Sequence, residues 1–132
     1  MNPLRPRTLA TALAGAAILI AASAQGDRYP ERPWGADSPA SRCVVCHSLE
    51  KGGPFRVGPN LWGIVGSPKA RDADWFNYSR ALMSKGGEWT REDLDAYLAA
   101  PSQYAPGTTK TIHVTDPEER ARIIDFLATL HD

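Results

Sequence analysis

Apolar residues in the second half of the chain recur every three or four positions, the spacing of one face of an α-helix. Leu94, Tyr97 and Leu98 share such a face, in a segment that begins at Thr90 and stops at Pro101. We therefore expect a helix here whose apolar side packs on a core.

The C-terminal segment predicts a second helix of the same kind. Asp116 suits the N-cap, Pro117 suits the first helical position, and two glutamates follow in the first turn. The expected inner face carries four apolar residues: Ala121, Ile124, Leu127 and Ala128.

The middle of the chain lacks this periodicity. Residues 51–70 contain five glycines and three prolines, which predicts a long ordered loop held in place by some other group. A short helix is expected within residues 72–87, ending at Gly86, and another is expected to begin at Ser38 and to carry residues 43–47. These segments therefore predict short helices joined by long loops.

The first residues follow a third pattern, which is typical of an export signal. Arg5 and Arg7 precede an uncharged, alanine-rich run, and small residues follow at Ala22-Ser23-Ala24. The predicted organisation is an export signal peptide at 1–24, an extended N-terminal segment at 25–36 and one domain at 37–132. An uncleaved membrane anchor is the alternative, although the run is shorter than the ~20 strongly apolar residues of a spanning helix.

The charge balance argues against polyanionic partners. Fifteen basic and fifteen acidic residues give a net charge of 0, and removal of the two arginines in residues 1–24 changes it to −2. This leaves no basic surplus for nucleic acid or for an anionic membrane surface. The remaining domain of about 108 residues is rich in loops, and small domains of that kind usually need a disulfide, a metal or a cofactor.

The stretch Cys43-Val44-Val45-Cys46-His47 contains the only two cysteines of the chain. A Cys43–Cys46 disulfide would close a loop too short to stabilise much, and a thioredoxin-type pair would need a preceding strand. Structural zinc usually needs four ligands, more than this stretch supplies. C-x-x-C-H is instead the c-type haem attachment signal, because two thiols add to the two vinyl groups and the next imidazole reaches the iron. We predict one covalently attached haem c.

Four stretches in this order resemble class I cytochromes c of mitochondria and bacteria: CVVCHSLEKGG, GPNLWGIVG, WTREDLDAYLAAPSQYAPGT and ERARIIDFLATL. The resemblance runs from about Cys43 to Leu130. It implies an all-α fold in which a few short helices and long ordered loops wrap around one haem, so that residues 37–132 form a cytochrome c domain.

The resemblance also implies roles for six residues: Cys43, Cys46, His47, Pro59, Tyr78 and Trp89. The two cysteines carry the haem, and His47 is the proximal iron ligand. The carbonyl of Pro59 accepts the second ring N–H of His47, which orients the imidazole. The two aromatic residues match positions near the buried haem propionate, with an ordinary core role as the alternative.

The sequence departs from the family pattern in two places. Gly35 matches the glycine of the first helix, but Pro39 stands where the family has an aromatic partner. More importantly, the family's distal ligand is a methionine two residues after Pro-Gly-Thr, and Lys110 stands there in this chain. Four arrangements stay open at this point: a distal His113, a distal Lys110, a distal Met83, or an open or water-bound iron.

Position favours Lys110, whereas the cost of losing a proton favours His113. The reference pKa is ~10.4 for lysine and ~6.5 for histidine, so only the lysine must give up a proton at pH 7. A nitrogen ligand favours Fe(III), and an open iron binds small molecules.

These observations predict an exported, periplasmic monohaem cytochrome that carries single electrons between redox protein partners and is not an enzyme. One alternative is a haem protein that binds NO, CO or peroxide at an open distal side. Another is an electron-transfer subunit of a dehydrogenase. Membrane association is expected only if the leader stays uncleaved.

Overall fold

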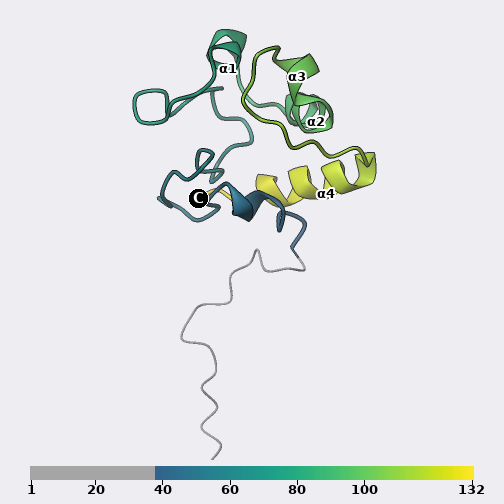
Figure 1. The fold of residues 1–132 in the computed structure, drawn as a ribbon. Helices are drawn as coiled ribbons and strands as arrows, with labels where there is room; N and C mark the ends of the chain where they lie inside the picture. Colours follow the sequence, from purple (N-terminus) through teal and green to yellow (C-terminus); the bar gives the residue numbers. More distant parts are fainter. Residues whose placement is uncertain (1–37) are drawn as a thin grey trace, which may run out of the picture. The chain divides into compact units, whose positions relative to one another are not determined.

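The computed structural model describes residues 38–132, in which short helices alternate with long loops (Figure 1). The elements are a 3-10 turn and four helices: η1 (Cys43–Val45), α1 (Arg80–Lys85), α2 (Arg91–Ala99), α3 (Pro101–Tyr104) and α4 (Pro117–Ala128). Within residues 38–132 the only β-type pairing is an isolated bridge between Pro68 and Glu88. The predicted all-α class is confirmed.

The predictions for residues 1–24 and 25–36, and the departure at Gly35, lie outside the described residues. In the described part, no helix combines the length and the apolar character that crossing a membrane requires.

The predicted helix starts are confirmed by side-chain caps. Ser79 Oγ accepts the amide of Leu82 at 3.2 Å and begins α1, which ends before Gly86 at a φ of 61°. Thr90 Oγ1 accepts the amide of Asp93 at 3.0 Å and begins α2. Asp116 caps α4 in the same way, with Pro117 in the first position. These caps satisfy amides that have no partner within the helix.

The expected helix from Ser38 through His47 is wrong. Residues 38–42 form turns, and only the single 3-10 turn η1 follows. Its N-cap, Arg42, makes no side-chain cap bond, and β-branched Val44 and Val45 favour helix only weakly. The segment therefore folds tightly, with the amides of both Cys46 and His47 donating to the carbonyl of Cys43.

Helices α2 and α4 pack on each other, and α4 runs below α2 and α3 in Figure 1. Leu94 of α2 is buried, as are Ile123, Ile124 and Leu127 of α4. The predicted inner face of α4 is wrong at Ala121, which is exposed. The stripe turns toward Ile123 instead, because the larger side chain removes more apolar surface from water.

Candidate functional site

The imidazole of His47 is fixed by the backbone of a distant loop. Its Nδ1 lies 2.6 Å from the carbonyl oxygen of Pro59. Because a carbonyl only accepts, Nδ1 carries the proton and Nε2 keeps its lone pair. Burial lowers the pKa of His47 more than the Pro59 bond raises it, which favours the neutral ring that a metal needs.

Gly58 leaves room for the ring of His47 because it has no side chain. A Cβ built on Gly58 would lie 2.2 Å from Cε1 of His47, far inside van der Waals contact. The amide of Gly58 also donates to the carbonyl of Cys46 at 2.8 Å. The imidazole thus lies directly against a backbone that only glycine allows.

Cys43 and Cys46 flank the same turn as free, half-buried thiols. Burial raises the pKa of Cys43 more than the nearby cations Lys110 and Arg42 lower it. Two thiols beside an imidazole with a free Nε2 form the donor set that covalent haem attachment uses, so these residues fit a haem c.

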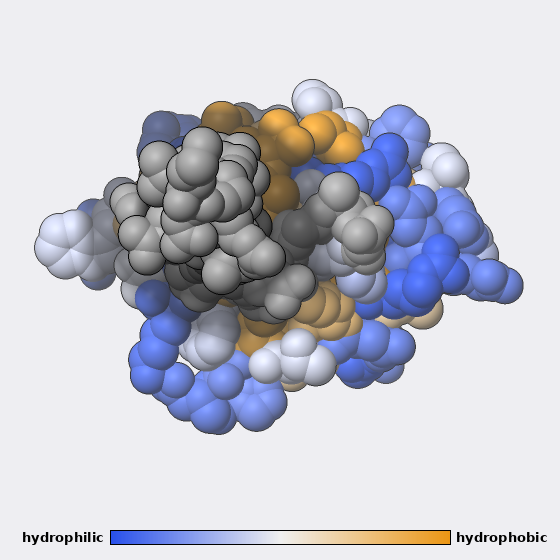
Figure 2. Space-filling view, turned by 90° about the horizontal axis from the view of Figure 1, so that it is seen from below, coloured by the Kyte–Doolittle hydropathy of each residue, from blue (hydrophilic) through white to orange (hydrophobic). Residues whose placement is uncertain are grey.

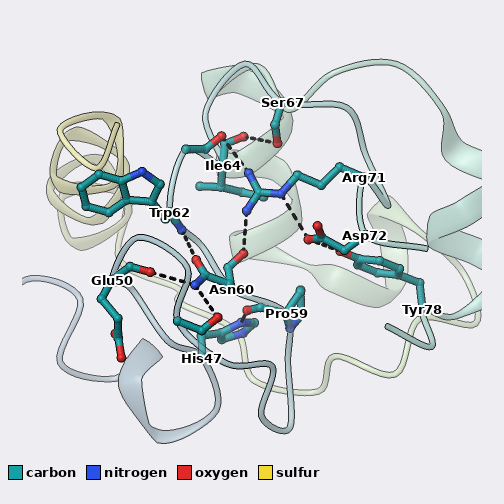
Figure 3. A network of polar contacts seen from close by, with 12 residues as sticks. His47, Glu50, Pro59, Asn60, Trp62, Ile64, Ser67, Arg71, Asp72 and Tyr78 are labelled. Carbon is teal, nitrogen blue, oxygen red and sulfur yellow. Dashed lines mark hydrogen bonds and ion pairs between the residues drawn. The ribbon is translucent and has the colours of Figure 1, made fainter. Parts of the chain in front are cut away.

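The loop after His47, the proximal segment (residues 47–72), is held by its own polar groups (Figure 3). The side-chain amide of buried Asn60 donates to the carbonyls of Glu50 and Gly53 at 2.8 and 2.9 Å. Its oxygen accepts the amide of Trp62 at 2.6 Å. One side chain therefore fixes both arms of the loop around Pro59.

Arg71 closes this network from the far end of the proximal segment (Figure 3). Its guanidinium donates to the carbonyls of Asn60 and Gly63 at 2.9 and 3.0 Å and to Asp72 at 3.2 Å. The hydroxyl of buried Tyr78 lies 3.3 Å from the same carboxylate. Burial and the charge of Asp72 raise the pKa of Tyr78 to about 12, so the hydroxyl remains a donor.

Trp89 lies in the aromatic part of the core. Its ring centroid is 5.1 Å from that of Tyr97 and 5.9 Å from that of Tyr104. The ammonium of Lys69 lies 5.3 Å from the indole and 2.9 Å from the carboxylate of Asp93. The side chain of Lys69 is only 4% exposed and that of Asp93 is 31% exposed, so a partly buried ion pair joins the proximal segment to α2.

Two of the candidate distal ligands, Lys110 and His113, lie in the distal loop (residues 105–114). Lys110 is half-buried, and its ammonium donates to the carbonyl of Ile112. His113 is exposed. Met83 is on α1, outside this loop, and is 45% exposed.

The sequence did not indicate three of the contacts that organise the site. Asn60 had a weak signal, since a polar residue after Gly-Pro in an ordered loop needs bonding partners. Arg71 and Lys69 had none, because a basic residue in a loop is usually solvated. Their partners lie far away in the sequence.

No family model matches the chain. A cytochrome c homolog of Rickettsia felis is 47% identical over 95 residues, which are 70% of this chain and 54% of that protein. Cytochrome c2 of Rhodomicrobium vannielii is 34% identical over 126 residues, 95% of this chain and 98% of that protein. The chain thus spans about half the length of the first relative and nearly all of the second.

A solved structure, cytochrome cH from Methylobacterium extorquens, superposes with a TM-score of 0.62 at 36% identity. The match covers 69% of this chain and 91% of that one. With the fold and the haem donor set in agreement, the chain belongs to the class I c-type cytochromes. Membership implies one covalently attached haem c as its cofactor, as the C-x-x-C-H spacing predicts.

Proposed function

We propose that the chain is an exported monohaem cytochrome that carries single electrons between redox proteins. The observation that carries the proposal is the 2.6 Å contact between His47 Nδ1 and the Pro59 carbonyl, which leaves Nε2 free. Haem supplies the one-electron couple of its iron. The chain supplies attachment, orientation and a water-poor surrounding.

In this proposal the thiols of Cys43 and Cys46 would hold the haem through two thioethers, and His47 Nε2 would bind its iron. The Pro59 carbonyl keeps the imidazole in one orientation and increases its basicity. Because Asn60 and Arg71 hold the loop around Pro59, the proximal ligand would not move when the iron changes charge. A ligand that stays in place keeps the energy of structural rearrangement during electron transfer low.

Tyr78 and Trp89 complete the proposed haem-binding set. Both are buried and both keep a polar edge, which suits a carboxylate of the haem. The hydroxyl of Tyr78 also has Asp72 as a partner at 3.3 Å, so Arg71 would offset the carboxylate charge gathered there.

The surface offers apolar groups for a partner protein. Val45 beside the cysteines is 68% exposed and Val57 beside Gly58 is 80% exposed. Figure 2 shows hydrophobic residues at separate places on one face of the molecule, with hydrophilic residues beside them. Such a face supports brief contact with redox proteins. The proposal of export rests on residues 1–24, in which basic residues are followed by an apolar run and then by small residues.

The test is expression in a bacterium with haem-attachment machinery. We expect haem that stays bound after denaturation, one per chain, and reversible one-electron reduction. In the Cys43→Ala variant one thioether link is lost, which the reduced spectrum reports. A chain that folds fully without covalent haem would contradict the proposal. N-terminal sequencing should begin at Gln25, whereas an intact leader in the membrane fraction would mean an anchor.

A second candidate function is the binding of a small ligand such as CO or NO. The observation that favours it is the sequence of the distal loop, which contains no methionine. Rapid CO binding by the reduced protein would put this function first.

A further inference from the structure

The distal loop is fixed at its two ends. At one end, the amide of Thr108 donates to the carbonyl of Ala105. The Oγ1 of Thr108 also lies 2.8 Å from the hydroxyl of Tyr97. At the other, the amide of Val114 donates to the carbonyl of Leu98 at 2.8 Å. Both anchors are on α2, so the residues between them have a defined side toward the core.

Between the anchors, Lys110 is the side chain that turns inward. Its neighbours Thr109 and Thr111 are exposed, as are Ile112 and His113. Lys110 alone of these five is half-buried. Its amide lies 3.4 Å from Thr108 Oγ1, which ties it to the Tyr97 anchor.

The half-buried Lys110 lies in the neighbourhood of the haem donor set. The charge of Lys110 acts on both Cys43 and His47, where it opposes ionisation of the imidazole and favours that of the thiol. A charge has these effects only at short range, since the interaction falls with distance and is screened by water. Lys110 is therefore near enough to the thiols and the ring of His47 for its charge to reach both.

His113 is held on the opposite side of the chain. It precedes Val114, which is 4% exposed and bonded to Leu98, and in an extended segment adjacent side chains point in opposite directions. Turning His113 inward would pull Val114 from the core and break its bond to Leu98. Met83 is also a poor candidate for the distal ligand, because its neighbour Leu82 occupies the buried position of α1.

We propose that Nζ of Lys110 is the distal ligand of the haem iron. The inference rests on the proposed function, because it needs the haem that His47 and the cysteines would hold. To serve as ligand, Nζ would give one proton to solvent, and its lone pair would then be available to the iron. The neutral amine keeps two hydrogens, so one N–H remains available to the Ile112 carbonyl that already accepts from it.

A lysine ligand gives the protein a distinct redox character. Two nitrogen donors favour Fe(III) more than a nitrogen and a thioether do, so the midpoint potential is low. A filled distal position also keeps CO from the reduced iron.

The experiment compares four holoproteins at pH 7: wild type, Lys110→Ala, Lys110→Met and His113→Ala. Covalent haem is measured first in each, so that failure of the proposed function appears as haem lost on denaturation. Absorption, EPR, CO binding and midpoint potential are then recorded. Lys51→Ala, at an exposed lysine ion-paired with Asp132, is the matched control.

We expect wild type, Lys51→Ala and His113→Ala to be low-spin and closed to CO. Lys110→Ala should become high-spin and bind CO, and Lys110→Met should gain a methionine–iron charge-transfer band and a higher potential. If Lys110→Ala does not fold, Lys110→Met alone decides. A high-spin wild type, a high-spin His113→Ala, or Lys110 variants with the wild-type spectrum and potential would each overturn the proposal.

Discussion

The proximal segment and the distal loop face the same proposed haem, yet the chain holds them in different ways. Asn60 and Arg71 bind five backbone groups around Pro59 in the proximal segment. The distal loop has its anchors at Thr108 and Val114, and its centre makes few bonds. The comparison teaches that, in the proposed haem site, the fold itself would orient the proximal ligand, whereas the distal ligand would depend on a single side chain.

The largest effect, a loss of covalent haem, is expected from Gly58→Ala, which changes the proximal segment where it contacts the imidazole of His47. The new Cβ would meet Cε1 of His47 at 2.2 Å, so either the ring or the loop must move. We expect loss of most of the holoprotein, measured as covalent haem per chain. Gly66→Ala is the control: its φ of 80° costs about 1 kcal/mol, but no atom lies within 4 Å. Equal haem content in both variants would contradict the expectation.

The next effect is expected from Asp93→Asn, which detaches the proximal segment from α2. It leaves the buried ammonium of Lys69 without its carboxylate, and loss of a hydrogen bond between charged groups costs about 1.5–3 kcal/mol. Denaturant unfolding of the holoprotein measures this loss. Glu92→Gln in the same helical turn is the control, and a loss below about 1 kcal/mol would mean that the pair does not hold the segment.

The same variant predicts a pH dependence. Bonds from Lys69 and Tyr104 lower the pKa of Asp93 in the folded protein. A carboxylate with a lowered pKa stabilises the fold above its unfolded pKa of ~3.9, and this stabilisation is lost as pH falls through the folded value. The difference between wild type and Asp93→Asn should therefore be full at pH 7 and shrink toward pH 3. A constant difference would argue against the ion pair.

Arg71→Met is expected to have a smaller effect on the same segment. It removes donors to two carbonyls and leaves Asp72 beside Tyr78, with a loss of roughly 2 kcal/mol in the free energy of unfolding. Arg80→Met, at an exposed position of α1, should be neutral. If the two variants unfold alike, the guanidinium does not brace the loop.

The smallest effect is expected in the distal loop, from Thr108→Val. The variant removes the partner of the Tyr97 hydroxyl at 2.8 Å and should cost about 1 kcal/mol. Covalent haem content should stay at the wild-type level, because the proximal segment is untouched. Thr109→Val, at the exposed neighbour, is the control. A loss as large as that of Arg71→Met would remove the contrast between the two regions.

The sequence predicted the helix starts and the haem attachment signal, which depend on residues close together in the chain. Ser79, Thr90 and Asp116 were recognisable helix starts because capping depends on a few adjacent residues. The haem signal was recognisable because its chemistry requires one spacing within five residues. The roles of Tyr78, Trp89 and the other site residues stay predictions.

The parts that could not be predicted depend on contacts between distant residues. Arg71 finds its carbonyls only after the loop has folded, and Lys69 finds Asp93 across 24 positions of sequence. The helix expected from Ser38 failed for a related reason, since its local signals were weaker than the tight turn that surrounds the cysteines.

The two-ended attachment of the distal loop also bears on how such a protein can diverge. Position 110 carries little of the packing of the core, so its side chain can be exchanged with little penalty to folding. If Lys110 is the distal ligand, one codon could change the preference of the iron between oxidation states while the rest of the chain stays as it is. Evolution could then retune the redox preference of such a cytochrome without rebuilding its core.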